Sequence, residues 1–554
     1  MQVHRKKMRL SATLLVLALG AAACGGGSDD GSTDDEGGGS ADAGASGGSY
    51  SIQINEPENP LVPGNTTETE GAQIVDALFT GLVTYDAETS ELQYDGVAES
   101  IESEDATTWT ITLKDGWTFH DGTPVTADSF IQAWNYTANS VNAQGSSYFF
   151  ANVEGYKDLQ AAEGAAAPAA TEMSGLKKVS DTEFTVTLTS PFRQYPLTTG
   201  YAAFYPLPEA FFAEGGAEAL GKTPIGNGPF QAESEFVPGQ GITLTRYEDF
   251  AGEPAKADTV EVKVYTDINT AYTDLQAGNL DVVGEVPPDA ITTYQDEFGD
   301  RSSSRPTSSF TYVGFPTYDA RFQDKRVRQA FSMAIDREGI TQAIFNGART
   351  PAFSAISPVV DGSREDACQY CEYKPDEAKA LLEETGFDTS QPIDLWFNAG
   401  AGHDEWMQAV GNNLRDNLGI QYKLQGGLQF AEYLPKGDAK GFTGPFRLGW
   451  AMDYPSPQNY LEPLYSTAAL APVGSNQTFY SNPEFDALIT EGNAAEDNEA
   501  AIEKYQAAED LLLEDMPIAP MFFAEQQTAW SERVSDVQVD AFTRVRLEDV
   551  TVNQ

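Results

Sequence analysis

The chain has 554 residues, and its 84 acidic side chains outnumber 33 basic ones, which gives a formal net charge of −51 at pH 7. A surface this acidic repels phosphate backbones, so the composition argues against a nucleic-acid-binding protein. The length and the 41% of hydrophobic residues predict several folded domains, and exclude a disordered chain or a small disulfide-stabilised scaffold. With three His and three Cys, a transition-metal site is hard to assemble, so we expect no metal and no cofactor.

The first 23 residues have the pattern of a secretory signal peptide. A basic stretch that ends at Arg9 precedes an uncharged segment from Ser11 to Ala23, which is shorter than the ~18 residues needed to span a bilayer. The three alanines before Cys24 resemble the cleavage motif of bacterial lipoproteins, in which the cysteine is lipidated and becomes the mature N-terminus. We therefore expect residues 1–23 to be removed and Cys24 to be lipidated. The alternative is an ordinary signal peptide followed by an incidental cysteine.

Residues 24–49 consist, after the cysteine, almost wholly of Gly, Ser, Asp, Glu, Thr and Ala. Such a segment buries too little apolar surface to offset the entropy lost on ordering, so we expect a flexible tether. The tether would hold a folded body close to a membrane. No later segment approaches bilayer-spanning length, so we expect this body at the cell surface, anchored to the outer face of the cytoplasmic membrane (the periplasmic side in a Gram-negative cell).

From residue 50 onward, strand patterns alternate with helix patterns. Apolar side chains at every second position predict strands over 108–114, 184–188 and 260–264. Residues 161–170, rich in alanine, are typical of a surface loop or insertion.

Three segments have helical patterns. Apolar residues at helical spacing predict one helix over 324–345. A second helix is predicted from Pro375 to the residue before Gly386, and a third begins at Pro483, after a capping asparagine. Together with the strands, these segments predict a mixed α/β fold without internal repeats.

Residues 216–223 satisfy the phosphate-loop pattern G-x-x-x-x-G-K-[ST]. A functional phosphate loop needs a strand before it and a helix after it, so that backbone N–H groups converge on the phosphate. Here a helix-like segment comes first, and Pro224 follows directly. We therefore interpret the match as coincidental.

Cys368 and Cys371 are separated by two residues, which is the spacing of a zinc half-site, a redox pair or a short disulfide. Zinc would need two further ligands, and the mature chain offers only His120 and His403 besides carboxylates. A redox role requires a thioredoxin-like strand and helix, which the surrounding residues do not suggest. We expect a structural disulfide formed in an oxidising compartment.

His120 and His403 are also the candidates for the base of a secreted hydrolase. The body from residue 50 onward has no G-x-S-x-G segment that would present a nucleophile. His120 is followed by Asp121 and Gly122, which is typical of a polar turn held by hydrogen bonds. We therefore expect no enzyme, although a hydrolase stays the alternative from another functional class.

Several segments resemble, in the same order, those of the family 5 extracellular solute-binding proteins, which are the oligopeptide- and dipeptide-binding receptors of ABC importers. The most specific is TTWTITLKDGWTFHDGTPVTADSFIQAW at 107–134, which is similar to the family's strand–turn–helix signature. Further similar segments lie at 77–86, 97–100, 225–230, 274–283, 322–340, 373–387, 482–489 and 515–523. The resemblance covers nearly all of the chain from residue 50 to residue 554.

The resemblance implies an α/β, two-lobed fold like that of periplasmic binding proteins (type II, cluster C), with an extra inserted domain. Lobe I would comprise 50–80, 186–305 and 523–554, the inserted domain 81–185, and lobe II 306–522. The chain would cross between the lobes near 308–311 and near 521–524. Closure of the lobes on a ligand would exclude water and strengthen each polar contact.

The resemblance also places a ligand site around the segment GWAMDYP at 449–455. Asp453 matches the aspartate that pairs with the α-ammonium group of a peptide, and Trp450 matches a tryptophan that lines the pocket, with Ala451 beside it. Tyr148 or Phe149 matches the aromatic residue offered by the inserted domain. The alternative for Asp453 is a structural aspartate that caps the turn before the proline.

We therefore expect a receptor that binds oligopeptides or dipeptides without catalysis and delivers them to an ABC permease driven by cytoplasmic ATPases. Members of the family also carry oligosaccharides, opines and nickel chelates, so a non-peptide solute is the alternative ligand. A receptor that signals ligand presence without transport is a third possibility. The expected protein is a monomer that contacts the membrane through its lipid anchor.

Overall fold

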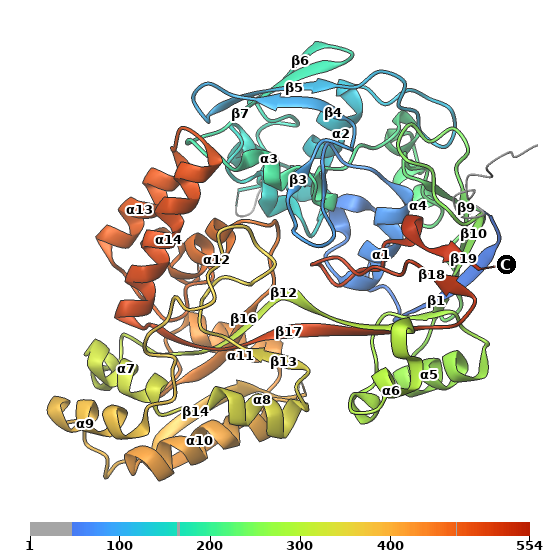
Figure 1. Cartoon of the computed structure of the whole chain (residues 1–554). Helices are drawn as coiled ribbons and strands as arrows, with labels where there is room; N and C mark the ends of the chain where they lie inside the picture. Colours follow the sequence, from blue (N-terminus) through green and yellow to red (C-terminus); the bar gives the residue numbers. More distant parts are fainter. Residues whose placement is uncertain (1–46, 163–166, 401, 473, 554) are drawn as a thin grey trace, which may run out of the picture. The chain divides into compact units, whose positions relative to one another are not determined.

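The computed structural model describes residues 47–162, 167–400, 402–472 and 474–553 (Figure 1). The predicted signal peptide, Cys24 and nearly all of the predicted tether lie outside the described residues, so cleavage and lipidation stay predictions. Within the described ranges, no helix is long and apolar enough to cross a lipid bilayer.

The largest element is an 11-stranded mixed sheet with the strand order β15-β14-β16-β12-β17-β11-β1-β10-β9-β8, and β13 pairs with β17 off this path. One half of the sheet comprises β1 (Ser49–Ile54), β8 (Phe230–Ala232), β9 (Gly241–Arg246), β10 (Thr259–Val264) and β11 (Val282–Val283). The other half comprises β13 (Arg349–Pro351), β14 (Ile393–Asn398), β15 (Tyr422–Leu428) and β16 (Phe446–Trp450).

Two long strands, β12 (Ser302–Gly314) and β17 (Ile518–Trp530), join the halves of this sheet. They pair antiparallel, with Ser302 opposite Ala529 at one end and Gly314 opposite Ile518 at the other. Figure 1 shows them side by side across the middle of the molecule. The ladder shifts register between Pro306 and Phe310, so its regular pairing is interrupted between the two lobes.

The first lobe surrounds β1 and carries a second, four-stranded sheet. The latter is antiparallel with the order β4-β5-β7-β6 and comprises β4 (Ala98–Glu102), β5 (Thr108–Leu113), β6 (Leu176–Ser180) and β7 (Glu183–Thr187). Two small hairpin-like pairs are β2 (Thr84–Tyr85) with β3 (Leu92–Gln93) and β18 (Val534–Ser535) with β19 (Thr551–Val552). The helices of this lobe are α1 (Thr69–Leu78), α2 (Ala127–Ala138), α3 (Tyr195–Thr198), α4 (Gly216–Leu220), α5 (Ile268–Ala277) and α6 (Tyr294–Phe298).

The three predicted strands are confirmed as β5, β7 and β10. In β5, Trp109, Ile111 and Leu113 are buried and alternate with more exposed threonines. Trp134 of α2 packs on Phe184 of β7, with ring centroids 5.5 Å apart, and on Phe204 at 5.3 Å. The core therefore runs without a break from the four-stranded sheet to the strands around β1, while α5 and α6 pack in a smaller separate cluster.

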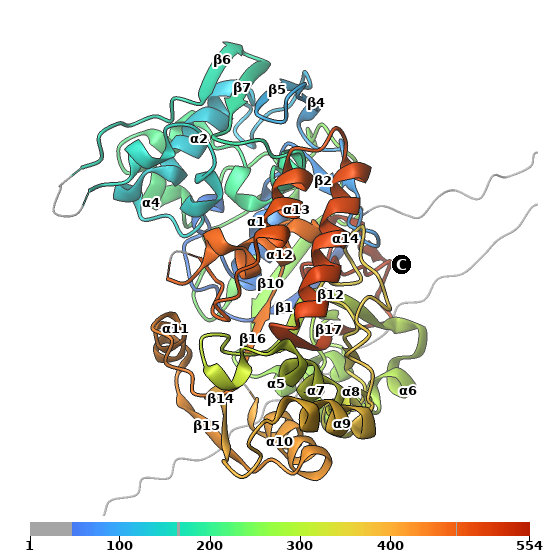
Figure 2. The same cartoon turned by 90° about the vertical axis from the view of Figure 1, so that its left-hand side faces the viewer.

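The second lobe has its own core, built on β12, β14, β16 and β17. Its helices are α7 (Lys325–Met333), α8 (Arg337–Phe345), α9 (Pro375–Thr385), α10 (Asp404–Leu418), α11 (Phe430–Asp438), α12 (Pro457–Tyr465), α13 (Pro483–Asn493) and α14 (Asn498–Asp515). Figures 1 and 2 show that α12, α13 and α14 lie toward the first lobe, whereas α9 and α10 lie at the opposite end.

The prediction of one helix over 324–345 is wrong, because the structure has two helices separated by residues 334–336. Asp336 leaves the helical conformation, and its side chain caps α8 by accepting a backbone N–H three residues later. The buried guanidinium of Arg337 donates to the backbone oxygen of Ser332 at 3.1 Å. The apolar spacing continues through the break, so hydropathy alone does not reveal it.

The two other predicted helices are confirmed. α9 has Pro375 in its first turn and ends at Gly386, where the φ of +70° favours glycine. α13 begins after Asn482, whose side chain accepts a hydrogen bond from the backbone N–H of Glu484 at 2.9 Å.

The phosphate-loop match does not form a phosphate loop. α4 occupies the residues that would have to remain a loop, and a short 3-10 helix over Glu209–Phe212 precedes it in place of a strand. The interpretation of this match as coincidental is confirmed.

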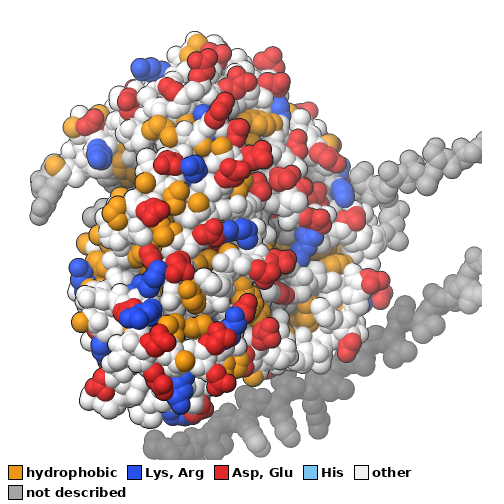
Figure 3. Space-filling view, turned by 60° about the vertical axis from the view of Figure 1, so that its left-hand side comes forward, with side chains coloured by type: hydrophobic (Ala, Val, Ile, Leu, Met, Phe, Trp, Pro, Cys, Tyr) orange, Lys and Arg blue, Asp and Glu red, His pale blue; other side chains and the backbone are white. Residues whose placement is uncertain are grey.

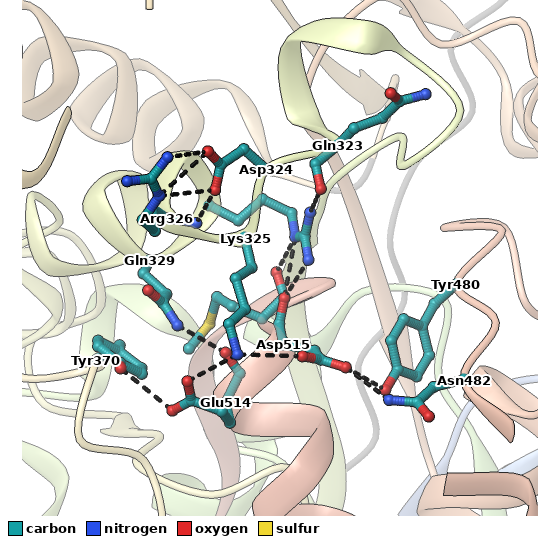
Figure 4. A network of polar contacts seen from close by, with 12 residues as sticks. Gln323, Asp324, Lys325, Arg326, Gln329, Tyr370, Tyr480, Asn482, Glu514 and Asp515 are labelled. Carbon is teal, nitrogen blue, oxygen red and sulfur yellow. Dashed lines mark hydrogen bonds and ion pairs between the residues drawn. The ribbon is translucent and has the colours of Figure 1, made fainter. Parts of the chain in front are cut away.

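A polar network joins the C-terminal end of α14 to α7 (Figure 4). Lys325 Nζ lies 2.9 Å from the carboxylate of Glu514 and 3.5 Å from that of Asp515. The guanidinium of Arg328 donates to the backbone oxygen of Asp515, and the hydroxyl of Tyr480 donates to its carboxylate at 2.9 Å. Cations are favourable here because the last carbonyls of a helix lack intrahelical partners and carry partial negative charge. The network therefore fixes α14 against the rest of the second lobe.

Cys368 and Cys371 are joined by a disulfide in the structure, and their Cα atoms are 5.3 Å apart. Both cysteines are buried in the second core. The backbone oxygen of Cys371 accepts a hydrogen bond from Arg337 at 2.8 Å, so the disulfide lies next to the start of α8.

Candidate functional site

The segment singled out in the sequence is the loop between β16 and α12. β16 ends at Trp450, and α12 starts at Pro457 after the capping residue Ser456. The Ser456 hydroxyl accepts the backbone N–H of Gln458 at 3.0 Å, and proline in the first helical position needs no N–H partner. The loop is therefore held at one end by the sheet and at the other by a capped helix.

Asn459, in the first turn of α12, holds the two main candidate residues of this loop. Its side-chain oxygen accepts the backbone N–H of Asp453 at 2.9 Å and the indole N–H of Trp450 at 3.1 Å. Its amide nitrogen donates to Oδ2 of Asp453 at 3.2 Å. Asn459 is only 2% exposed, so these bonds are protected from water. Our sequence analysis missed Asn459, because no pattern marks an amide six residues after an aspartate as its partner.

Tyr148 of the first lobe meets Asp453 of the second lobe. Its hydroxyl donates to Oδ1 of Asp453 at 3.2 Å. The Tyr148 ring stacks on Phe149 at 4.6 Å, and Phe149 stacks on Tyr201 at 4.5 Å. Tyr148 is 53% exposed, whereas Phe149 packs against the first core. The structure therefore brings Tyr148 to Asp453 across 305 residues of sequence, with Phe149 behind it.

Burial raises the pKa of Asp453 to about 6, although the hydrogen bonds from Asn459 and Tyr148 act in the opposite direction. Burial, with a contribution from the charge of Asp453, also raises the pKa of Tyr148, which therefore stays a protonated donor. The two side chains that bond this carboxylate are neutral, so neither supplies a counter-charge. Such a carboxylate beside an aromatic ring can pair with the ammonium group of a ligand.

Ala451 is exposed on the same loop, and Trp450 is half-buried, so the structure keeps both candidate residues within the segment that carries Asp453.

Arg447, on the same strand as Trp450, is a group that our sequence analysis missed. Its Nη1 donates to Asn398 at 3.3 Å, and its Nε is buried without a partner among the described residues. Burial lowers the pKa of Arg447, and a carboxylate could supply the missing partner.

The two histidines of the body have structural partners. His120 Nδ1 accepts the backbone N–H of Gly226 at 3.1 Å, and its Nε2 lies 3.2 Å from the backbone oxygen of Gly228. His403 Nδ1 accepts the indole N–H of Trp406 at 3.2 Å. Burial lowers the pKa of both histidines to about 4. These bonds hold turns and side chains in place.

A cavity of about 490 Å³ in the first lobe is separate from this loop, since neither Tyr148 nor Asp453 lines it. Ion pairs cross its wall: Arg544 lies 2.5 Å from Asp76 and 3.2 Å from Asp540. Arg544 is thus paired with two carboxylates, and we assign no ligand to this cavity.

Comparison with known proteins identifies relatives over most of the chain. The family model of bacterial extracellular solute-binding proteins, family 5 (middle region), matches residues 94–471. The oligopeptide-binding protein OppA of Bacillus subtilis is 25% identical over 513 residues, which are 89% of this chain and 91% of that protein. The heme-binding protein A of Haemophilus influenzae is 25% identical over 390 residues, or 68% of this chain and 70% of that protein.

A solved structure, the unliganded open form of the periplasmic murein tripeptide-binding protein MppA, matches with a TM-score of 0.80. The match covers 92% of this chain and 99% of that chain at 23% sequence identity. The predicted two-lobed α/β fold of the type II periplasmic binding proteins is confirmed by this likeness.

Proposed function

Because this chain belongs to the bacterial extracellular solute-binding proteins of family 5, which bind solutes and are not enzymes, we propose that it captures peptides outside the cell and delivers them to an ABC permease driven by cytoplasmic ATPases. The observation that carries the proposal is the contact between Tyr148 of one lobe and the carboxylate of Asp453 in the other. A ligand held there touches both lobes at once, so binding favours their closure.

Each candidate residue has a role in this proposal. Asp453 pairs with the α-ammonium group of the peptide, and Tyr148 lies against the same group. Trp450, fixed by Asn459, covers ligand side chains with its ring, while Ala451 and Phe149 complete the wall. A peptide also carries a carboxylate, for which Arg447 supplies a buried guanidinium.

We propose the predicted boundaries for the lobes: lobe I comprises 50–80, 186–305 and 523–554, the inserted domain 81–185, and lobe II 306–522. The separate hydrophobic cores of the first and second lobes support the division between lobe I and lobe II, whereas the inserted domain shares the core of lobe I. The register shift between Pro306 and Phe310 supports a hinge at the predicted crossing, because strands bend most easily where their ladder is interrupted.

The receptor is proposed to be a monomer anchored through lipidated Cys24. The net charge of −51 supports the monomer, since like charges spread over a surface keep copies apart. Figure 3 shows acidic side chains over the whole face that it draws, with fewer Lys and Arg between them. Metabolic labelling with a fatty acid, compared with the Cys24→Ala variant, tests the anchor.

The direct test of the proposal is ligand identification. The protein is purified without denaturation, and mass spectrometry identifies small molecules that leave it on unfolding. Calorimetry then measures binding of dipeptides, tripeptides and longer peptides. Peptides in the first experiment and saturable binding in the second are the expected results; tight binding of another solute with no peptide binding would overturn the peptide assignment.

A non-peptide solute is the second candidate, favoured by the similarity to a protein named for heme binding. Heme, oligosaccharides, opines and metal chelates therefore belong in the same calorimetric series. Binding of heme or an oligosaccharide with no effect of Asp453→Asn would favour this candidate, because neither has an α-ammonium group for the carboxylate.

The affinity for a peptide is expected to fall as the solution is acidified below pH 6. The pKa of Asp453 is raised to about 6, so its carboxylate is mostly ionised at pH 7 and mostly protonated at pH 5. Only the ionised form pairs with an α-ammonium group, which keeps its proton throughout this range. We therefore expect the dissociation constant to rise about tenfold between pH 7 and pH 5. Calorimetry at several pH values measures it, and an N-acetylated peptide, which lacks the charge, should show a flat profile.

A further inference from the structure

A short segment of the first lobe, residues 192–194, is docked on the helices of the second lobe that adjoin the ligand loop. The backbone N–H of Arg193 donates to the backbone oxygen of Asn493, at the end of α13, at 2.8 Å. Its Nε donates to the backbone oxygen of Ala495, also at 2.8 Å. The Phe192 ring lies 6.1 Å from the ring of Tyr454, the neighbour of Asp453. The lobes are therefore in contact here as well as through β12 and β17.

Gln194 makes the most buried of these contacts. Its side-chain oxygen accepts the hydroxyl of Ser456, and its amide nitrogen donates to Oδ1 of Asn498 at 2.5 Å. Gln194 is 3% exposed and Ser456 is fully buried, so water cannot replace the bond between them without a rearrangement, whereas the bond to Asn498 is only part-buried. The Gln194 side chain does not cap its own helix, α3, and both of its bonds go to the other lobe.

Ser456 connects this contact to the ligand loop. It is the capping residue of α12, whose first turn carries Asn459. Asn459 in turn fixes the backbone and the carboxylate of Asp453. A chain of hydrogen bonds thus leads from Gln194 through Ser456 and the start of α12 to the carboxylate, although Gln194 itself does not bond to Asp453.

We infer that Gln194 is a positioning residue for the ligand site, which holds the loop of Asp453 in its binding geometry by tying the start of α12 to the opposite lobe. The inference rests on the proposed role of Asp453 as a ligand contact. If Gln194 has this role, the geometry of the ligand site depends on how closely the two lobes approach, because Gln194 belongs to the first lobe and Ser456 to the second.

The test compares the Gln194→Met variant with a matched control in the full-length protein. Methionine keeps the length of the side chain and removes both hydrogen bonds. The control is Gln73→Met, because Gln73 is also buried and also makes two bonds, to the backbone N–H and oxygen of Val545, which belongs to the same lobe as Gln73. Asn498→Ala is a milder second variant, since Asn498 is exposed and the substitution removes only the hydrogen bond that it accepts from Gln194.

The first readout needs no ligand. Hydrogen–deuterium exchange at the amides of Asp453 and Gln458 should speed up about tenfold in Gln194→Met, less in Asn498→Ala and not in Gln73→Met. The second readout is the dissociation constant for a tripeptide, which should rise about five- to twentyfold in Gln194→Met alone.

The outcomes separate this inference from the proposed function. Unchanged exchange at 453–458 in a folded Gln194→Met protein would overturn the inference, whatever the ligand is. Faster exchange with no peptide binding in the parent protein would support the tie and overturn the peptide assignment instead. Equal losses of affinity in Gln194→Met and Gln73→Met would indicate general destabilisation and would also overturn the inference. If Gln194→Met does not fold, Asn498→Ala decides by the same exchange measurement.

Discussion

Replacement of Asp453 by asparagine is expected to raise the dissociation constant for a peptide with a free α-amino group by about 30- to 4,000-fold. Removing one partner of a buried, hydrogen-bonded charge pair costs about 2–5 kcal/mol of binding free energy, and each 1.4 kcal/mol is about tenfold. The α-ammonium group would then be desolvated without a counter-charge, since the side chains that bond Asp453 are neutral. Calorimetry with the same peptide on both proteins measures the change.

Two controls show whether Asp453→Asn weakens binding through the loss of charge or through a disturbance of the loop between β16 and α12. Asparagine offers one acceptor where Asp453 uses two oxygens, one for Tyr148 and one for Asn459. Asp394→Asn is the matched variant, because Asp394 of the same lobe also accepts from two neutral groups, Gln425 at 3.0 Å and Thr443 at 2.6 Å. It should leave the dissociation constant unchanged.

An N-acetylated peptide is the complementary control on the ligand. It lacks the ammonium group, so it should bind the parent protein and the Asp453→Asn variant with similar, weak affinity. Equal affinity of both proteins for the free peptide would refute the assignment of Asp453.

The largest loss of stability is expected from Arg337→Met. This guanidinium is 2% exposed and donates to the backbone oxygens of Pro520, Ser332 and Cys371 at 2.5, 3.1 and 2.8 Å. Burial lowers its pKa to about 9, so it is still charged at pH 7. Methionine fills much of the volume but removes these donors from the carbonyls of Pro520 and Cys371, whereas the Ser332 oxygen keeps the backbone N–H of Ile335 at 3.2 Å. We expect the free energy of unfolding to fall by about 3–5 kcal/mol.

Chemical denaturation, followed by a probe in the second lobe, measures this loss. Arg326→Met is the control, because Arg326 is a half-exposed residue of α7 that pairs with Asp324 (Figure 4). An exposed pair of this kind contributes at most about 1 kcal/mol. Arg337→Lys should fall between the two, since it keeps the charge but not the planar fork of donors. If Arg337→Met proved as stable as Arg326→Met, the carbonyls around Arg337 would not depend on it.

Elements whose signals lie within their own residues could be predicted from the sequence. The alternation in 108–114 and 260–264 is sufficient for a strand, because successive side chains of a strand face opposite sides. The proline at the start of α9 and the glycine at its end are sufficient for both boundaries of that helix. The break between α7 and α8 was missed because the apolar spacing continues through it, although Asp336, which caps α8, is a capping residue type that the sequence displays.

The candidate site was predicted in part. The sequence resemblance pointed to Asp453, Trp450 and Tyr148. In the structure, Trp450 and Asp453 both donate hydrogen bonds to the side chain of Asn459, and Tyr148 donates one to the carboxylate of Asp453. Asn459 and Gln194 could not be found in this way. Buried amides are recognised by their partners: those of Asn459 depend on the fold of the loop before α12, and those of Gln194 are known only once the lobes are packed.

The sequence by itself determined the family, the order of most strands and helices, and the residues with the chemistry to bind an ammonium group. The strands and helices follow from periodicity and capping, which act over a few residues, whereas the family and the candidate residues follow from the resemblance of ordered motifs. Only the tertiary structure decided that Tyr148 reaches Asp453, that Asn459 holds the loop and that Gln194 ties it to the other lobe. The physical reason is that burial and hydrogen-bond partners are properties of packing, so neutral neighbours and a raised pKa at Asp453 arise only when segments far apart in the chain meet.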